Sequence, residues 1–434
     1  MTRFERVPGT RDFYPEAMRV RRWIEERWRE VALLYGFEEY DAPAIEPLEL
    51  FTVKSGEEIV GQLYAFEDRG GRKVALRPEM TPSLARMVAA RSQGLARPIK
   101  WFSIPRLFRY ERPQRGRFRE FWQLNLDILG VPGVEADAEI IAAGVDSLKA
   151  CGLGAGDFVV RYSDRRLLDR ALARLQVPTG RWPAAFVALD KMTRGGPDET
   201  REALARAGVE ERAAMILMEA VGRRERQGFE AALAEAGVDL AAESAALDEL
   251  EAQLGAYGMA EYCAFDAAIV RGLAYYTGIV FEMHDRAGEL RAICGGGRYD
   301  DLLAGLGGER LPAVGFGLGE AVLTELLERI DRAPLTRGRC EAYVIPVSAG
   351  ERLYALGVAT RLRGAGVRTD MALRDTSLGR GLKSAAKAGA RVAVVIGERE
   401  RAAERLTVRD LSTGEESVLG IEEAIARLCD GSAR

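Results

Sequence analysis

Residues 108–121 have the sequence Phe108-Arg-Tyr-Glu-Arg-Pro-Gln-Arg-Gly-Arg-Phe-Arg-Glu-Phe121, in which arginines are interleaved with aromatic residues. Strand patterns at 101–110 and 120–129 flank this polar segment, which predicts a long antiparallel hairpin with a basic loop at its tip. Guanidinium groups bind phosphate bidentately and also stack on flat rings. The segment is therefore suited to hold a polyanion beside a planar base. Taken alone, it is also compatible with a generic RNA-binding surface or with a structural ladder of ion pairs.

The segments before and after this hairpin predict further helices and strands. Residues 16–35 carry apolar residues at helical spacing, and Gly36 follows as a C-cap. Residues 37–45 are extended in pattern but contain Pro43, which suits an edge strand or a bend. The other elements expected before residue 162 are a hairpin at 62–68 and 73–76 and helices at 78–93 and 136–151.

Beyond residue 162 the pattern changes twice. Residues 163–262 are rich in Ala, Leu, Glu and Arg and nearly free of strand patterns, which predicts a helical insertion. From residue 339, strands and helices alternate as in a small α/β domain. The elements expected between these segments are strands at 267–270, 278–284 and 291–294, glycine-dense loops and a helix at 319–330.

The predicted fold class is an α+β catalytic domain with an antiparallel sheet and a helical insertion, followed by a C-terminal α/β domain. The expected boundaries are 1–162 for the first part of the catalytic domain, 163–262 for the insertion, 263–330 for the second part, 331–338 for a linker and 339–434 for the last domain.

Three glycine-containing segments are candidates for ligand contact. Glycine lets a ligand approach the backbone closely, but turns explain such clusters at least as often. None of the segments fits the spacing of a Rossmann or P-loop motif. We expect the adjacent Tyr275 and Tyr276 on one strand, with one side chain in a cleft and the other in the core. The segments are Val270-Arg-Gly-Leu-Ala-Tyr-Tyr-Thr-Gly278, Cys294-Gly-Gly-Gly-Arg-Tyr-Asp300 and Val314-Gly-Phe-Gly-Leu-Gly319.

The composition favours a globular protein with sizeable cores. The longest apolar runs have strand length, too short for a membrane span, and the charged N-terminus lacks the apolar region of a secretory signal. The 5 cysteines are dispersed without a CxxC pair, which favours reduced thiols and a cytoplasmic location.

The single histidine, His284, excludes multi-histidine metal sites, and we expect it at a strand edge. Because the net charge is −4, any nucleic-acid-binding surface has to be a local basic face, such as residues 106–119 or 361–391.

Taken together, these segments resemble the class II aminoacyl-tRNA synthetases, and the histidyl-tRNA synthetase family in particular, over nearly the full chain. The first helix and the extended segment with Pro43 resemble motif 1, which forms the dimer interface in that family. Residues 109–119 match motif 2 closely. Leu76-Arg-Pro-Glu-Met-Thr81, the RGLAYYTG stretch and GGGRYD match segments that shape the amino-acid site, and the last domain resembles the family's anticodon-binding domain. The resemblance implies a histidine–tRNA ligase that uses ATP and Mg²⁺, acts on L-histidine and tRNA(His) and forms a homodimer.

The resemblance also assigns roles to individual residues. Arg109 and Arg271 are the implied catalytic residues, because a fixed cation beside the α-phosphate of ATP stabilises the charge that develops there. The implied ATP-binding residues are Arg109, Glu111, Arg117 and Phe121. The implied histidine-binding residues are Glu79, Thr81, Gln123, Asp127, Arg271, Tyr275, Tyr276 and Tyr299. The implied tRNA contacts are Gln114, Arg115, Arg380 and Lys383, and no protein side chain is implied as a metal ligand.

The sequence departs from the family's pattern at three places. Ala274 stands where the family usually has an aspartate, and Trp122 stands where a histidine is common before Gln123, with changed residues at Asn125 and Asp127. Val322 stands where motif 3 usually carries an arginine that lies over the triphosphate. Either activation is crippled by this loss or another cation takes the place of that arginine.

Two alternatives to a ligase remain at this stage. One is a catalytically inactive paralogue that serves as the regulatory subunit of ATP phosphoribosyltransferase in histidine biosynthesis. The other is an amino-acid sensor or an RNA-binding protein without chemistry. The nearly complete motif 2 and the C-terminal domain favour the ligase.

Overall fold

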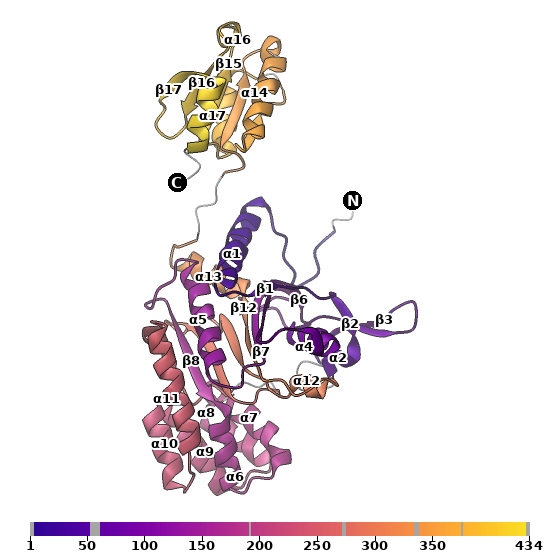
Figure 1. Ribbon diagram of the computed structural model, residues 1–434, viewed down its shortest axis with the longest axis vertical. Coiled ribbons are helices and arrows are strands. Elements are labelled where there is room, and N and C mark those ends of the chain that lie inside the picture. The colour runs from indigo at the N-terminus through magenta and orange to yellow at the C-terminus, as the bar shows by residue number, and fades with distance from the viewer. Residues whose placement is uncertain are drawn as a thin grey trace. The chain divides into compact units, whose positions relative to one another are not determined.

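The computed structural model describes residues 4–52, 61–190, 192–270, 275–333, 338–374 and 376–430. The chain folds into two compact units, residues 1–334 and 335–434 (Figure 1). The segment expected to be a linker, residues 331–338, lies at this division and falls partly outside the described residues.

A sheet of nine strands forms the centre of the first unit, within the residues that the structure describes. The strands are β1 Glu38–Glu39, β5 Ile99–Ser103, β6 Arg106–Phe108, β7 Glu120–Leu129, β8 Phe158–Asp164, β9 Cys263–Phe265, β10 Ile279–Asp285, β11 Cys294–Arg298 and β12 Ala313–Gly319. Their order is β1-β5-β7-β12-β11-β10-β8-β9, and β6 also pairs with β7. Neighbours are antiparallel except for β1 with β5 and β8 with β9. This mostly antiparallel sheet confirms the predicted class of the catalytic domain.

The basic loop lies at the end of a hairpin whose first arm is divided. β7 is continuous, whereas the opposite strand is split into β5 and β6 on either side of Pro105. Proline has no amide hydrogen for the ladder, so the strand is interrupted there. The predicted antiparallel hairpin is confirmed, and the prediction of one unbroken strand over 101–110 is wrong.

The glycine segments 294–298 and 313–319 are strands in the middle of the sheet, so the prediction that they form loops is wrong. Their neighbours occupy the space that side chains would need. A Cβ added to Gly296 would lie 2.5 Å from the carbonyl oxygen of Gly315 and 2.6 Å from Cζ of Phe281. Glycine in a strand interior marks such close approaches. The predicted strands at 267–270 and 291–294 are also displaced, because pairing places β9 and β11 at other residues.

Three helices cover one face of this sheet and enclose the main core: α1 Pro15–Leu34, α5 Glu135–Lys149 and α13 Glu320–Arg329. Gly144 lets α5 lie close to the sheet, since a Cβ there would be 2.5 Å from Cε of Met283 in β10. Trp28 of α1 is fully buried in the same core. The helices predicted at 16–35, 136–151 and 319–330 are confirmed.

A smaller core lies on the other face of the sheet. The shorter helices of this unit are α2 Leu48–Thr52, α4 Thr81–Arg91, η1 Ser92–Gly94 and α12 Leu302–Gly305. A separate three-stranded sheet has the order β2-β4-β3, with β2 Ile45–Pro47, β3 Tyr64–Glu67 and β4 Lys73–Leu76. The predicted hairpin of β3 and β4 is confirmed. Leu84 and Val88 of α4 pack with Tyr276 and Tyr299 in this core.

Between β8 and β9 the described chain is helical, as the sequence predicts for this segment. The helices are α6 Arg165–Arg174, η2 Thr179–Arg181, α7 Trp182–Asp190, α8 Met192–Arg206, α9 Glu211–Arg223, α10 Arg226–Glu235, α11 Ala241–Ala256 and η3 Ala260–Tyr262. Asp164 ends β8 and caps α6, because its side chain accepts a hydrogen bond from the amide of Arg166 at 2.9 Å.

The second unit contains a five-stranded sheet in the order β14-β13-β15-β16-β17. Its elements are β13 Ala342–Pro346, η4 Ala349–Glu351, α14 Arg352–Gly364, β14 Thr369–Met371, α15 Leu378–Lys387, β15 Val392–Ile396, α16 Glu398–Ala402, β16 Arg405–Asp410, β17 Glu416–Gly420 and α17 Ile421–Asp430. The alternating part, β13 to β15, is parallel as expected, and the antiparallel β16 and β17 extend it.

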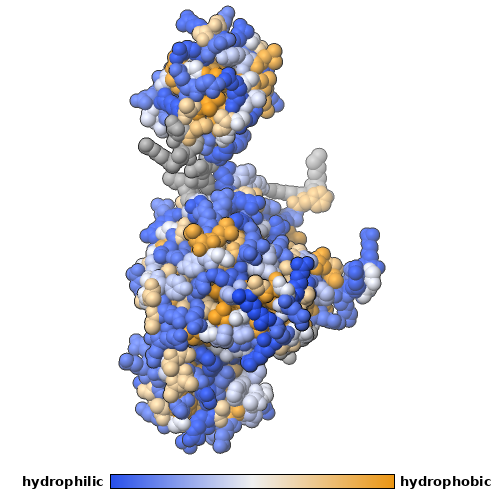
Figure 2. Space-filling view, viewed as in Figure 1, coloured by the Kyte–Doolittle hydropathy of each residue, from blue (hydrophilic) through white to orange (hydrophobic). Residues whose placement is uncertain are grey.

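Two faces of this second sheet carry different helices. Val344 packs in one core with α14 and α17, whereas Tyr343 and Ile345 pack in another with Ala385 of α15. Since successive residues of a strand face opposite sides, α15 and α17 lie on opposite faces. Figure 2 shows a mostly hydrophilic surface with small hydrophobic patches. Within the described ranges, no helix is long and apolar enough to span a membrane.

Candidate active site

A cavity of about 720 Å³ lies beneath the basic loop and against the sheet. Its walls come from the basic loop and β7, from the segment between β10 and β11, and from the start of α13. Four residues predicted to bind ATP meet in this lining: Arg109, Glu111, Arg117 and Phe121.

Arg109 is fixed in place from two sides. Its Nε donates to the carbonyl oxygen of Pro78 at 2.9 Å, and its guanidinium carbon lies 5.3 Å from the ring centroid of Phe121. A guanidinium over an aromatic face gains a cation–π attraction. Arg109 therefore presents a positioned cation to the cavity.

Glu111 is buried and forms an ion pair with Arg117, and both side chains line the cavity. Arg119 supports the same loop from outside, because its Nε donates to the backbone oxygen of Glu111 at 3.0 Å and its guanidinium lies over the ring of Tyr110. The arginines of the loop thus divide into those that line the cavity and those that hold the loop.

A smaller pocket of about 60 Å³ adjoins this cavity. Arg109, Gln123, Gly295 and Gly317 line both, so the two spaces are neighbours that share a wall. Six residues predicted to bind histidine line the smaller pocket: Glu79, Thr81, Gln123, Tyr275, Tyr276 and Tyr299.

Asp127, also predicted to bind histidine, lies behind this pocket. The hydroxyl of Tyr299 donates to Oδ1 of Asp127 at 2.5 Å, and both side chains are buried. Burial raises the pKa of Asp127 to about 7, although the hydrogen bond from Tyr299 acts in the opposite direction. The lining contains Tyr299 itself, so Asp127 acts on the pocket by orienting that phenol.

The adjacent tyrosines line the pocket together, so the prediction that they lie on one strand and face opposite ways is wrong. Tyr275 and Tyr276 precede β10, and their ring centroids are 5.0 Å apart. The hydroxyl of Tyr275 donates to Oε2 of Glu79 at 3.0 Å. Tyr275 thereby joins the buried carboxylate to the aromatic side of the pocket.

Asn125 also lines the smaller pocket and was not predicted. Alternate residues of a strand share a face, so Asn125 follows from the positions of Phe121, Gln123 and Asp127 on β7. That alternation is the signal from which it could have been found.

His284 lies on β10, an inner strand, and lines the larger cavity, so the prediction of a strand-edge residue is wrong. Its Nε2 is 2.9 Å from Oε2 of Glu282, which lines the same cavity. The polar pair forms part of the wall that faces the basic loop.

The residues predicted to touch the acceptor end of tRNA lie at the loop tip. Gln114 lines the larger cavity, whereas Arg115 is exposed and forms an ion pair with Glu325 of α13. Val322 of α13 lines the cavity too, and its Cγ2 would lie 3.3 Å from a Cβ on Gly116. The motif 3 position therefore contacts the turn of the basic loop.

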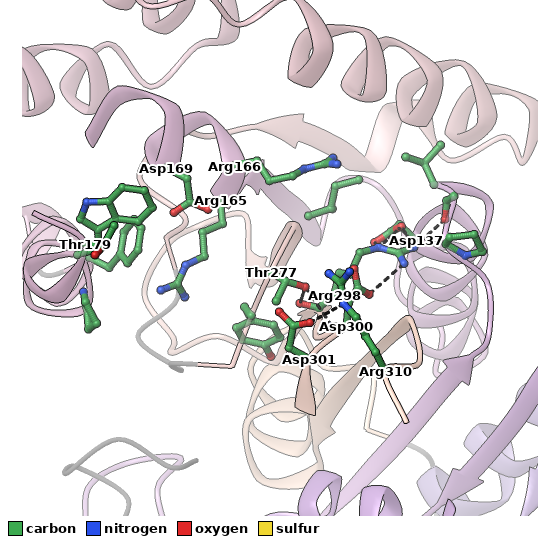
Figure 3. A pocket seen from close by; sticks show the side chains of 18 of the residues that line it. Asp137, Arg165, Arg166, Asp169, Thr179, Thr277, Arg298, Asp300, Asp301 and Arg310 are labelled. Carbon is green, nitrogen blue, oxygen red and sulfur yellow. Dashed lines mark hydrogen bonds and ion pairs between the residues drawn. The ribbon is translucent and has the colours of Figure 1, made fainter. Parts of the chain in front are cut away.

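A second cavity of about 720 Å³ lies between the sheet and the helices after β8 (Figure 3). Figure 3 shows Arg298 between Asp137 and Asp300. Arg298 is buried, and its Nε donates to Oδ2 of Asp137 at 3.0 Å. Burial raises the pKa of Asp137 to about 6, against the opposing effect of Arg298. Arg298 therefore anchors the segment that follows the glycines of β11.

The remaining residues named in the sequence analysis are not among the described residues that line these pockets. Arg271 and Ala274 fall outside the described residues. Arg380 and Lys383 are exposed on α15 of the second unit. In the part of the chain that the structure describes, no group of three or more His, Cys, Asp or Glu could hold a metal ion.

A basic hairpin on a mostly antiparallel sheet, with a large cavity beneath it and a small polar pocket beside that, defines the catalytic domain of a class II aminoacyl-tRNA synthetase. The family model for histidyl-tRNA synthetase matches residues 9–322, and the model for the anticodon binding domain matches residues 341–430. The chain therefore belongs to the histidyl-tRNA synthetase family.

Individual relatives agree with this assignment. The chain is 43% identical to the histidine–tRNA ligase of Opitutus terrae, over 99% of both chains. It is also 43% identical to the chloroplastic/mitochondrial histidine–tRNA ligase of Arabidopsis thaliana, over 94% of this chain and 83% of that one. The crystal structure of histidyl-tRNA synthetase from Nostoc has a TM-score of 0.83 at 25% identity and covers 98% of this chain and 100% of its own. The function is that of a histidine–tRNA ligase. These relatives support the ligase over the alternative of a regulatory subunit of ATP phosphoribosyltransferase.

Proposed function

We propose that the larger cavity binds ATP and the smaller pocket binds L-histidine, so that the two substrates meet at Arg109. The observation that carries this proposal is that Arg109 lines both spaces. A carboxylate in the smaller pocket then faces the α-phosphate, and a positioned guanidinium neutralises the charge that grows on that phosphate.

The chemistry proceeds in two displacements. A carboxylate oxygen of histidine attacks the α-phosphorus, the bond to the bridging oxygen breaks, and pyrophosphate leaves with the electron pair. The terminal ribose hydroxyl of tRNA then attacks the carbonyl carbon of histidyl-adenylate, loses its proton and releases AMP. Neither step requires a covalent bond to the enzyme.

The nucleotide contacts follow from the cavity lining. Phe121 offers a flat ring for the adenine, and Glu111 offers a buried carboxylate for its amino group. Arg117, which pairs with Glu111, carries a second cation toward the phosphates. Arg271 stays a predicted contact of the α-phosphate on the strength of the family resemblance.

The histidine contacts divide into two ends. Glu79, with Thr81 at the start of α4, suits the ammonium group. At the other end the imidazole meets Tyr276 and Tyr299. Since the hydroxyl of Tyr299 donates its hydrogen bond to Asp127, its oxygen can accept one from an imidazole N–H. A ligand without that N–H leaves buried polar groups unpaired, which gives the pocket its selectivity.

Mg²⁺ fits the donor set of the larger cavity. This ion is usually bound by one or two carboxylates together with substrate phosphates. Among the described lining residues, the carboxylates are Glu111, which forms an ion pair with Arg117, and Glu282, whose Oε2 lies 2.9 Å from Nε2 of His284. Glu282, whose partner is a histidine and not a guanidinium, would share the ion with the phosphates, although the family resemblance implies no side-chain ligand. When bound, the ion neutralises charge on the departing pyrophosphate.

The tRNA contacts extend over both units. Gln114 and Arg115 at the loop tip are proposed to touch the acceptor end. On α15, Gly381 and Ala385 face the sheet, whereas Arg380 and Lys383 are exposed. We assign this exposed basic face to the anticodon arm of tRNA(His).

A homodimer and a cytoplasmic location complete the proposal. Leu34 at the end of α1 is 85% exposed and Ile45 in β2 is 49% exposed. These belong to the segment that resembles motif 1, where a partner subunit would cover exposed apolar side chains. The 5 cysteines are free thiols, which suits a reducing compartment. Analytical ultracentrifugation of wild type and of Leu34→Glu tests the dimer, with a monomeric variant expected.

Pyrophosphate exchange into ATP tests the proposed function, with each amino acid supplied in turn. Exchange that depends on histidine alone supports the assignment of the two pockets. Arg109→Ala is expected to abolish it, and Arg119→Lys serves as the comparison within the same loop. Exchange that is unchanged in Arg109→Ala would contradict the proposal.

A further inference from the structure

The wall of the larger cavity formed by α13 is apolar where class II enzymes usually place a cation. Gly319, Ala321 and Val322 line this wall. Val322 is 7% exposed, and its Cγ2 supports the turn at Gly116. A triphosphate carries several negative charges, and cations near its outer phosphates would compensate them.

Arg291 lies on the neighbouring wall of the same cavity. Residues 290–294 line it continuously. The amide of Gly319 donates to the carbonyl oxygen of Ile293 at 3.0 Å, so this wall adjoins the start of α13. Nη1 of Arg291 donates to Oε1 of Gln114 at 3.3 Å. The guanidinium therefore extends from the sheet side toward the tip of the basic loop, close to where Val322 meets Gly116.

The turn that carries Arg291 is held in place by contacts within the protein. The buried carboxylate of Asp285 accepts hydrogen bonds from the amides of Glu289 and Leu290, both at 3.0 Å. Glu289 also forms an ion pair with Arg329 of α13. A guanidinium on such a turn has less freedom to lose when it binds phosphate.

We propose that Arg291 binds the outer phosphates of ATP and supplies the charge that Val322 cannot. This inference rests on the proposed function, namely that the larger cavity holds ATP. With Arg109 at the α-phosphate and Arg117 on the basic loop, Arg291 completes a set of guanidinium groups around the triphosphate. Its hydrogen bond to Gln114 also links the loop tip to the opposite wall of the cavity.

Steady-state pyrophosphate exchange of Arg291→Ala, Arg291→Lys and wild type tests the proposal. Arg291→Ala is expected to lower kcat/KM for ATP by about tenfold to a hundredfold and to leave KM for histidine unchanged. Arg291→Lys keeps the charge but not the fork, so an intermediate value is expected. Arg310→Ala, which removes an exposed arginine paired with Asp301 outside this cavity, is the matched control. The double variant Arg291→Ala/Val322→Arg is expected to recover part of the loss, because a guanidinium then enters from α13.

Calorimetric titration separates phosphate binding from a structural effect. Arg291→Ala is expected to weaken binding of pyrophosphate and ATP, and to bind AMP as wild type does. Equal losses for AMP, ATP and histidine, or kcat/KM for ATP equal to wild type, would overturn the role of Arg291. If wild type shows no histidine-dependent exchange, the proposed function fails, and the titrations with ATP and pyrophosphate still decide whether Arg291 binds phosphate.

Discussion

The phenolic oxygen of Tyr299 lies 2.5 Å from Oδ1 of Asp127, and both groups are buried beneath the smaller pocket. This contact joins the residue after β11 to the last part of β7, two strands separated in the sheet by β12. It fixes which lone pairs the phenol presents to the pocket, and it makes Asp127 a positioning residue.

Removal of the phenol tests this arrangement. Tyr299→Phe is expected to raise KM for histidine by about tenfold or more, because an imidazole N–H loses its acceptor. KM for ATP should change little. Tyr162→Phe removes a hydroxyl bound to Glu251 away from both pockets and serves as the control. A rise in KM for histidine in both variants would show that the effect is not local.

The raised pKa of Asp127 predicts a pH-dependent stability. A carboxyl whose pKa is raised from 3.8 to about 7 in the folded state binds its proton more tightly there than in the unfolded chain. Its contribution favours folding below about pH 4 and is lost as the pH rises through about 7. The unfolding free energy of wild type minus that of Asp127→Asn should therefore fall across this window, by at most roughly 1.4 kcal/mol per pH unit. Urea titrations along this range measure it, and a constant difference would contradict the prediction.

The close contacts of the glycine strands predict intolerance of even one methyl group. Gly296→Ala places a Cβ 2.5 Å from a backbone oxygen and 2.6 Å from a buried ring, so a loss of about 1–3 kcal/mol in unfolding free energy is expected. Gly255→Ala, in exposed helix with open space around it, should be neutral or stabilising. Thermal unfolding of both variants checks this, and equal melting temperatures would contradict the close packing around Gly296.

The buried ion pair of Arg298 and Asp137 predicts a large loss when one partner is removed. Arg298→Ala leaves the Asp137 carboxylate without its partner, which is expected to cost about 3–5 kcal/mol of stability. Arg310→Ala breaks an exposed pair with Asp301 and should change stability little. Denaturant midpoints of the two variants provide the comparison. A small effect of Arg298→Ala would mean that the pair is not needed to hold β11.

The basic face of α15 predicts a separation of the two reaction steps. Arg380→Glu/Lys383→Glu is expected to raise KM for tRNA by about tenfold and to leave pyrophosphate exchange unchanged, since the substitutions lie in the second unit. Arg427→Glu on α17 changes a charge on the opposite face of the same sheet and is the control. Equal aminoacylation by all three proteins would exclude α15 as a tRNA contact.

Much of the fold follows from local patterns in the sequence. The helix of residues 15–34 and the strand of residues 120–129 match their predicted periods closely, because burial on one face or on both leaves a regular apolar pattern. The four residues predicted to bind ATP line one cavity, since all lie on one hairpin. The residues predicted to bind histidine came from the family resemblance, because local patterns alone do not indicate that they share a pocket.

The parts that were missed depend on contacts between distant segments. Glycine disfavours strands, so the positions of β11 and β12 become clear only when their neighbours in the sheet are known. Arg291 and Gln114 are 177 positions apart, and no periodicity links them. The prediction of an edge position for His284 rests on its place just after an apolar strand pattern, and its position on an inner strand follows only from the order of the sheet.

The glycine strands beneath the two pockets also limit how substrate choice could be altered. Gly295, Gly315 and Gly317 of these strands line the smaller pocket, and a Cβ added to Gly315 would lie 2.6 Å from the carbonyl oxygen of Leu126. With the smaller pocket proposed to bind histidine, we expect variation for an imidazole analogue to be tolerated better on the β7 face, at Gln123 or Asn125, or at the tyrosines. A library of variants at those positions would change the side chains around the smaller pocket and leave the glycine strands β11 and β12 unchanged.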